Sequence, residues 1–449
     1  MTVIGVRRIL FPLVFSALAC RAQSPTAPAP TALTSLPRVL SASEQKLIAS
    51  SNTFGFDLFK QINSAQRDSN VFVSPLSASM ALEMTANGAG GTTYDAFHST
   101  LRLGDATKQE VNDGYKSLIA LLTSLDPDTD MRIANSIWYE KTFPVKAAFL
   151  TESKSYFNAQ VRPLYFRSVA SVDTVNSWVS DATMKKIPTI IDSIDPAEVM
   201  FLINAIYFNG SWQQKFDKAN TVDAPFYGID GKSRSVPLMH LTKDIRVAVL
   251  PGMKAVDLYY GNSAFAMTVV LPDSGTSVNA LTESMNGTTW QTLLNAFHSR
   301  PVEVFLPRFK VEWQKKLNDD LSAMGLGIAF SDNADFTPMS EMGNRLDLSR
   351  VIQKTFVNVD EEGTEAAAAT VVGVQQDRDN TAVVPTQEKP RRDLSRRGSF
   401  ACSSQQSAVS SQRSAVSGQR SAVIKPFNVP RCESQRSPAS HRRIARSQL

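Results

Sequence analysis

The sequence predicts an α+β fold, and three observations support that prediction. Some segments, such as 43–62, carry apolar residues at helical spacing, whereas 199–208 is almost continuously apolar, as in a strand buried on both faces. Helices and strands are mixed without the strict alternation of a doubly wound sheet. No internal repeat is present in the body of the chain.

The helices are predicted from apolar spacing and from signals at their ends. Ser41 and Glu44, three residues apart before the first apolar run, have the spacing of a capping box. The second helix opens after a Ser-Pro turn and is broken by the glycines of 88–91. The predicted helices are 43–62, 77–84, 107–125 and 317–324, and the predicted strands are 131–139, 199–208, 265–271, 302–306 and 355–359.

Composition excludes several classes of protein. With 43% hydrophobic and 20% charged residues in 449, the chain is not disordered throughout. Its three cysteines are Cys20, Cys402 and Cys432, so the body has no internal disulfide and no cysteine zinc site. The four histidines are scattered, and we expect neither a metal nor a cofactor. Nucleotide-binding, P-loop and nucleophile-elbow motifs are missing, so we expect no enzyme.

Charge is divided unevenly along the chain. Residues 377–449 carry a net charge of +9 and residues 1–376 a net charge of −4. The pI near 9.0 therefore reflects the tail. We expect no nucleic-acid partner, although a basic tail that binds anionic surfaces or nucleic acid is an alternative.

The N-terminus has the pattern of an export signal in residues 1–19. Arg7 and Arg8 precede an apolar run over 9–19, which is too short to span a bilayer and ends in a small-x-small cleavage site. A buried core helix is the alternative. Residues 20–40 form a Pro/Ala/Thr-rich linker. Cys20 is either a bacterial-type lipidation site, and then the only membrane anchor, or incidental. We expect an exported protein, extracellular or periplasmic.

Seven stretches, in order along the chain, together resemble one family, the serpins. They include NVFVSPLS at 70–77, LINAIYFNGSW at 202–212 and VDEEGTEAAAAT at 359–370. The full set is 70–93, 133–138, 175–179, 202–212, 304–312, 329–336 and 359–370.

The resemblance implies one large domain over 41–376, with three β-sheets, eight or nine helices and a mobile reactive loop. It implies inhibition of a serine protease by a monomer. The protease attacks the loop and forms a covalent acyl complex, and the cleaved loop then inserts into the central sheet as a strand. Such proteins store strain that insertion releases.

The resemblance places the hinge of that loop at 361–370. Alternation puts Thr364, Ala366, Ala368 and Thr370 on one face, where small uncharged side chains fit beneath helices. Gly363 gives backbone freedom at the pivot. Local propensity alone favours a short helix instead. The hinge residues are Glu361, Glu362, Gly363, Thr364, Glu365, Ala366, Ala367, Ala368, Ala369 and Thr370.

A second group of positions corresponds to the region where the central sheet opens. Its members are Ser74, Ser77, Asn204, Trp212, Arg308 and Gln353. The resemblance predicts an ion pair between Glu361 and Arg308; the alternative is two solvated charges. Gln353 stands where the family often has histidine, and its amide can still donate and accept.

The tail, 377–449, departs from the family. Counting along the loop places the scissile residue at Asp377, or one position later at Arg378, which would suit a trypsin-like protease. A basic low-complexity stretch with a seven-residue repeat then replaces the apolar C-terminal strands. We expect this tail to be disordered, to add no strand, and to result from a frameshift. A non-inhibitory or defunct serpin-fold protein is therefore the alternative function.

Overall fold

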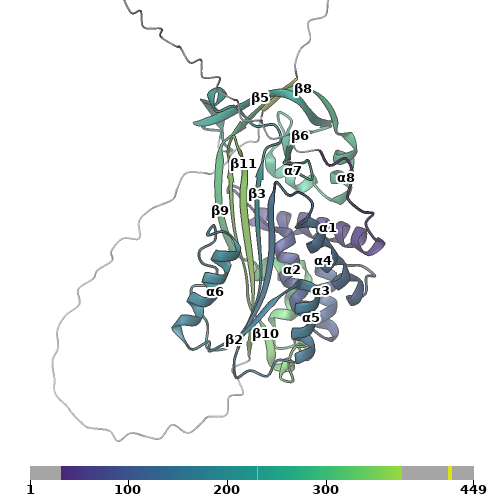
Figure 1. Ribbon diagram of the computed structural model, residues 1–449, viewed down its shortest axis with the longest axis vertical. Helices are drawn as coiled ribbons and strands as arrows, with labels where there is room; N and C mark the ends of the chain where they lie inside the picture. Colours follow the sequence, from purple (N-terminus) through teal and green to yellow (C-terminus); the bar gives the residue numbers. More distant parts are fainter. Residues whose placement is uncertain (1–31, 230, 377–422, 427–449) are drawn as a thin grey trace, which may run out of the picture. The chain divides into compact units, whose positions relative to one another are not determined.

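The central element is a six-stranded sheet in the order β2-β1-β3-β11-β10-β9 (Figure 1). The computed structural model describes residues 32–229 and 231–376, and the backbone of 423–426. All neighbours in this sheet are antiparallel except β1 and β2. The strands are β1 (Asp130–Glu140), β2 (Gln160–Leu164), β3 (Glu198–Ser211), β9 (Phe309–Lys316), β10 (Leu346–Val359) and β11 (Gly363–Gln376).

A second sheet has the order β12-β8-β5-β6-β7, with β4 paired to β5. The strands are β4 (Val222–Tyr227), β5 (Ser233–Leu250), β6 (Met253–Tyr260), β7 (Phe265–Pro272), β8 (His298–Pro307) and β12 (Val423–Pro426). The resemblance implied three sheets, whereas the described strands form two. The reason is that β5 is continuous over 18 residues and pairs with β8 and then with β6.

Helices cover both faces of the central sheet. They are α1 (Ala42–Ala65), α2 (Pro75–Ala86), α3 (Gly91–Thr100), α4 (Lys108–Leu122), α5 (Ala147–Phe157), α6 (Val169–Ala182), α7 (Val278–Ser284), α8 (Gly287–Ala296) and α9 (Asn318–Leu321). Figure 1 shows α6 on one face and α2 with its neighbours on the other. The predicted capping box is present: Ser41 accepts from the Glu44 N–H, and the Glu44 carboxylate accepts from the Ser41 N–H. The α+β prediction is confirmed.

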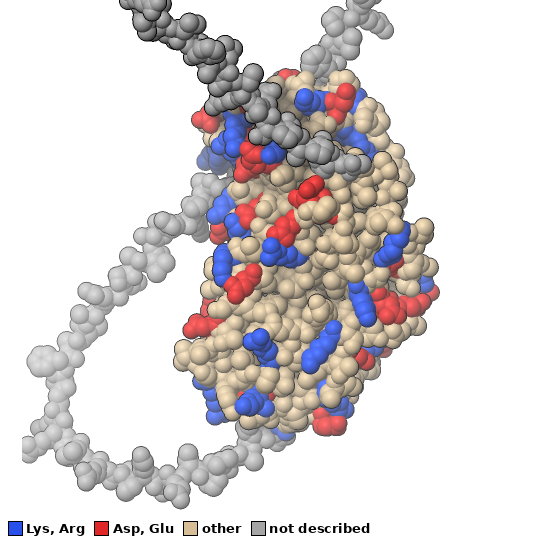
Figure 2. Space-filling view, viewed as in Figure 1, with Lys and Arg blue, Asp and Glu red and all other residues tan. Residues whose placement is uncertain are grey.

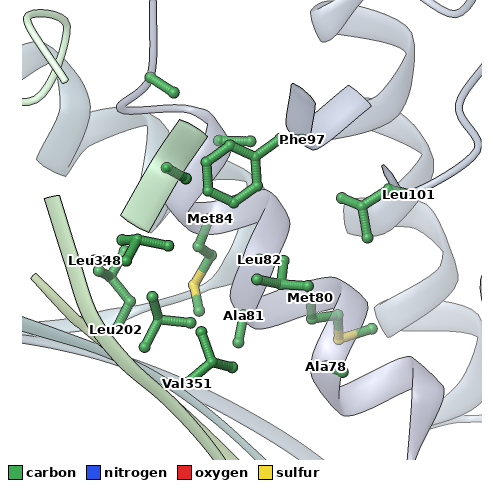
Figure 3. Packing of buried hydrophobic residues seen from close by; sticks show 14 of the residues in the cluster. Ala78, Met80, Ala81, Leu82, Met84, Phe97, Leu101, Leu202, Leu348 and Val351 are labelled. Carbon is green, nitrogen blue, oxygen red and sulfur yellow. The ribbon is translucent and has the colours of Figure 1, made fainter. Parts of the chain in front are cut away.

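The largest core lies between α2 and the central sheet. Met80, Leu82 and Met84 of α2 pack with Leu202 of β3 and Val351 of β10 (Figure 3). This core explains why α2 is apolar nearly all round: its other sides meet α1, α3 and α5. The helix therefore fixes the face against which any strand entering this sheet must fit.

The tail contributes one strand, which corrects the prediction that it adds none. Val423–Pro426 form β12 and pair antiparallel with 302–305 of β8. Val423 and Ile424 are adjacent β-branched residues in a polar tail, and such residues favour strands. The remaining tail residues, 377–422 and 427–449, lie outside the described residues, as does the predicted export signal.

The second sheet ends at β7, and an apolar groove lies beside that strand. A cavity of about 350 Å³ is lined by Val71, Phe72, Met267, Val269, Phe309 and Val311. Within the described ranges, β7 pairs only with β6. The groove therefore combines a free strand edge with half-buried apolar side chains.

Lysine and arginine are interspersed with aspartate and glutamate on the face that Figure 2 shows. In the part of the chain described, no helix combines the length and apolar composition needed to cross a bilayer. The same residues contain no group of three or more His, Cys, Asp or Glu side chains that could hold a metal ion.

Candidate functional site

The hinge segment is a strand in the middle of the central sheet. β11 lies between β3 and β10 and pairs with both, from Thr364 opposite Gly210 and Val359 to Val374 opposite Met200 and Leu348. The resemblance implied an exposed loop, whereas the structure shows this segment inside the sheet. The short helix favoured by local propensity is also absent from 363–376, because a strand here satisfies its backbone groups on both sides.

One face of β11 packs toward α2 and the second sheet. Thr364 is 5% exposed and its hydroxyl accepts from the Tyr260 hydroxyl at 2.6 Å. Ala368 and Thr370 are buried, and Ala366 is half-buried against the core of the second sheet. Small side chains at these positions let the strand fit beneath α2 without displacing it.

The opposite face of β11 packs toward α6. Ala367 and Ala369 are buried in a cluster that includes Val175 and Val179 of that helix. Glu365, at the more open end, accepts from the Tyr207 hydroxyl at 2.8 Å and pairs with Lys186 at 2.7 Å. Burial is the main cause that raises the pKa of Tyr207, and the hydrogen bond with Glu365 is the second. This phenol therefore stays protonated and remains a donor at neutral pH.

Gly363 begins β11 at a very close approach of two backbones. A Cβ atom here would overlap the carbonyl oxygen of Gly210 on β3. The sequence predicts Gly363 because the pivot needs backbone freedom, and the structure adds a steric reason. No side chain fits between the two strands at this point.

Glu361 and Arg308 form a bidentate ion pair at the entrance to the sheet. Arg308 Nε donates to the two carboxylate oxygens at 2.7 and 2.8 Å, and Thr221 donates to the same carboxylate. The Glu361 side chain is only 2% exposed, unlike a solvated charge. Burial alone would raise the pKa of Glu361, but the hydrogen bonds from Arg308 and Thr221 hold it below the ordinary value.

Trp212 lies beside this ion pair and ties the loop base to the second sheet. Its indole N–H donates to the carbonyl of Asp360 at 2.7 Å, and its ring stacks on Tyr260 with centroids 4.5 Å apart. Glu362 points outward, where hydrogen bonds from Lys215 and Lys218 lower its pKa to about 2.

A buried hydrogen-bonded cluster joins β11 to the start of α2. Gln353 accepts from the Ser74 N–H at 2.9 Å and donates to the Ser74 carbonyl at 3.0 Å. The same amide donates to Thr370 at 2.9 Å, and the Thr370 and Ser77 hydroxyls are 3.0 Å apart. Sequence reasoning named Thr370 only as a small residue, whereas the structure makes it the contact between inserted strand and helix.

Asn204 is placed beside this cluster but bonds elsewhere. It lies opposite Thr370 in the strand register, and its amide donates to Asn135 at 2.9 Å. The structure therefore joins Ser74, Ser77 and Gln353 through Thr370 and gives Asn204 a different partner.

The comparisons with known proteins agree on one family. The family model described as serpin (serine protease inhibitor) matches residues 49–390. The chain belongs to the serpin family. A leukocyte elastase inhibitor of Sus scrofa is 33% identical over 73% of this chain and 89% of its own length.

Solved serpin-like structures resemble this serpin in fold. Reactive-loop-cleaved human thyroxine-binding globulin aligns with a TM-score of 0.71 at 27% identity, over 75% of this chain and 100% of its own. A thermophilic serpin, tengpin, in the latent state gives a TM-score of 0.68 at 31% identity, over 75% and 90%. The fold of this serpin is thereby established.

Three predicted positions of the serpin lie outside the described residues. They are Cys20, Asp377 and Arg378. The positions that sequence reasoning missed are Thr221 and Tyr260, which contact Glu361 and Thr364. Neither residue belongs to a local sequence motif, because folding brings each to the loop base from a distant part of the chain.

A buried carboxyl group in α2 was also missed. Neither carboxylate oxygen of Glu83 has a hydrogen-bond partner among the described residues, and its side chain is buried. Burial raises the pKa of Glu83 to about 7, although the charge of Lys108 opposes that shift. The sequence feature that could have revealed this group is a single acidic residue within the mostly apolar stretch 80–86.

Proposed function

We propose that this serpin inhibits a serine protease as a suicide substrate, through insertion of β11 into its central sheet. The observation that carries the proposal is the fit of β11 between β3 and β10, with small side chains on both covered faces. β11 pairs with two strands at once along most of its length.

The chemistry follows that of ordinary serine-protease acylation. The protease serine attacks the carbonyl of the scissile residue, which we place at Asp377 or Arg378, and the new amino terminus leaves. The ester then joins protease and inhibitor covalently. Insertion of 363–376 carries the ester to the far end of the sheet before water can hydrolyse it.

Incubation with a panel of serine proteases, followed by SDS gels, tests this proposal. We expect a covalent complex that resists SDS with at least one protease, and sequencing of the released fragment gives the scissile bond. Clean cleavage by every protease, with no complex, would refute inhibition.

The second candidate is a serpin-fold protein without inhibitory activity. The apolar groove and free edge of β7 favour it, because they leave part of the second sheet uncovered. Thyroxine-binding globulin, a solved neighbour, carries a ligand-binding name. Cleavage without complex formation, in a chain that is well folded, would support this candidate.

We also propose that the protein is exported as a monomer and that Cys20 is its lipid attachment site. The proposal rests on the sequence pattern at 1–20. Mass spectrometry of the mature N-terminus tests it, with Cys20→Ser as the control. An unmodified cysteine in the mature protein would exclude the anchor.

A further inference from the structure

An ion pair crosses over β11 near the end of that strand. Glu198 belongs to β3 and Arg350 to β10, the strands on either side of β11, and their charged groups meet at 2.7 Å. Neighbouring strands are spaced at about 4.8 Å, so β3 and β10 lie about 10 Å apart with β11 between them. Glutamate and arginine are long enough to meet across that gap, and these two side chains are only 2% and 18% exposed.

Irregularities in both neighbouring strands bring the two side chains to the same face. The pairing of β11 with β3 skips Val199, and its pairing with β10 skips Ser349. Val199 and Met200 therefore both face the core beside α2, where a regular strand would place them on opposite faces. Glu198 and Arg350 are thereby left to meet on the other face, toward α6.

Gly373 of β11 lies directly beneath this ion pair. It stands opposite Arg350 in one register and opposite Phe201 in the other. The Arg350 guanidinium lies 5.3 Å from the centre of the Phe201 ring, which packs in the cluster beneath α6. A Cβ atom at Gly373 would lie 2.5 Å from the Ser349 hydroxyl and 3.0 Å from the Glu198 carboxylate. The pair can therefore close over the strand because residue 373 has no side chain.

Further hydrogen bonds hold the two charged groups in place. Ser349 donates to the Glu198 carboxylate at 2.7 Å, and the N–H of Asp195 donates to it at 2.8 Å. Arg350 also donates to the carbonyl of Ser193 at 2.7 Å. Both charges thus have additional partners, which a buried ion pair needs in order to offset its loss of hydration.

We infer that Glu198 and Arg350 form a clasp that closes over Gly373 and holds the last residues of the inserted strand in the sheet. Both are positioning residues, because each acts on the reaction through β11. The inference rests on the proposed function and deepens it, since the scissile residue proposed above follows Gly373 by only four or five positions. Holding 371–376 in place keeps the ester at the far end of the sheet. The clasp therefore determines how long the covalent complex lasts.

Hydrogen exchange of the protein after trypsin cleavage within 377–422 tests the clasp in the state that the proposed function describes. Sequencing of the fragments identifies the bond that was cut. Glu198→Ala should make amides of 371–376 exchange about tenfold or more faster than in the parent, with little change in 364–370. Peptides from β1 report whether each variant is folded.

Asp320→Ala is the matched control. It removes a carboxylate from an ion pair with Lys315 that has the same 2.7 Å separation and nearly the same burial, at 4% and 19% exposed. Lys315 belongs to β9, which lies on the other side of β10 from β11. The control should therefore leave the exchange of 371–376 close to that of the parent.

A double-mutant cycle tests whether the clasp closes over Gly373. In the parent, Gly373→Ala should speed the exchange of 371–376 about tenfold, because the new methyl group displaces Ser349 and Glu198. In the Glu198→Ala background the same change should have less than about a twofold effect, since Ser349 is no longer held and can turn aside. Additive effects of the two changes, or equal exchange of 371–376 in Glu198→Ala and Asp320→Ala, would overturn the inference.

The half-life of the SDS-resistant complex gives the functional readout. Glu198→Ala should shorten it about tenfold or more, while the rate of protease attack stays unchanged and Asp320→Ala keeps the parent's half-life. An equal half-life in the parent and in Glu198→Ala would also overturn the inference. If the parent forms no complex with any protease, the proposed function fails, and exchange in the cleaved protein alone decides whether the clasp holds β11.

Discussion

The hydroxyl of Thr370 lies 3.0 Å from the hydroxyl of Ser77, deep in the protein, and so bonds the inserted strand to the first turn of α2. Gln353 joins the same pair from the neighbouring strand β10. Three segments distant in sequence thus share one buried polar cluster, which exists only while β11 is in the sheet. Side-chain hydrogen bonds of Thr370 therefore mark the inserted arrangement, in addition to the backbone pairing of β11.

Thr370→Val should weaken the inserted arrangement. The change keeps the shape of the side chain but removes the hydroxyl, which leaves the Ser77 hydroxyl without its buried partner and leaves Gln353 bonded to Ser74 alone. We expect a loss of about 1–3 kcal/mol in the free energy of unfolding, measured by urea titration. Thr174→Val is the matched control, because the Thr174 hydroxyl donates to Ala170 on an exposed part of its own helix. Equal losses in the two variants would contradict the role of the cluster.

Thr364→Arg should convert an inhibitor into a substrate. Thr364 is 5% exposed in β11, so insertion would bury an unpaired charge at a cost of several kcal/mol. We expect the yield of SDS-resistant complex to fall about tenfold or more while cleavage continues. Gln376→Arg places the same charge at the half-exposed end of β11 and should retain the complex. If Thr364→Arg inhibits as well as the parent, insertion is not the mechanism.

Glu361→Gln should destabilise the protein at neutral pH, and the effect should decline as the pH falls through the lowered pKa of Glu361. The pKa of Glu361 is held below 4.5 when folded, so its contribution is present above that value and is lost as pH falls through the folded pKa. We expect a loss of about 1–3 kcal/mol at pH 7, from the charged hydrogen bonds to Arg308 and Thr221. Glu312→Gln, at an exposed pair with Lys310, is the control. A loss that stays the same size at every acidic pH at which the protein is folded would show that charge is not responsible.

Glu83→Gln should have the opposite dependence on pH. Since burial raises the pKa of Glu83 to about 7 from 4.5, unfolding releases a proton between these values, and the protein loses stability as pH rises. The loss is about 3 kcal/mol at about 1.4 kcal/mol per pKa unit. Urea unfolding should therefore find the variant more stable than the parent at pH 7.5 and equal to it at pH 4. Glu152→Gln, at a half-exposed ion pair with Lys108, should show no such gain. A Glu83→Gln variant without a gain at pH 7.5 would mean that the carboxyl has found a partner.

A serpin C-terminal peptide added in trans should bind beside β7. The groove there offers a free strand edge and apolar side chains such as Met267 and Val269. We expect the thermal midpoint to rise by a few degrees, since about 1 kcal/mol shifts it by about 2–4 °C in a domain of about 150–250 residues and by less in a larger one. A scrambled peptide of equal composition is the control. An unchanged midpoint with a saturating peptide would mean that the groove does not accept a strand.

Prediction from the sequence worked best where a single physical requirement determines the residue type at each position. The period of two in 364–370 predicted which side chains of a strand would share a face, and the structure has that alternation. The same segment's state could not be predicted from local preference, because Glu-Ala repeats favour a helix and pairing with β3 and β10 overrides them. Composition misled at 423–426, where two β-branched residues suffice for backbone pairing in a polar tail. Tyr260 and Thr221 could not be predicted at all, since only the folded chain brings them to the hinge.

The two-sided covering of β11 constrains how this protein can change over generations. Between Thr364 and Val374, one face meets α2 and the second sheet and the other meets α6, so enlarging almost any side chain disturbs a helix or a sheet. Under the proposed function, diversification toward new proteases has to take place after Gln376. One stretch of chain is thereby divided at a single residue into a part that must stay constant and a part that is free to vary.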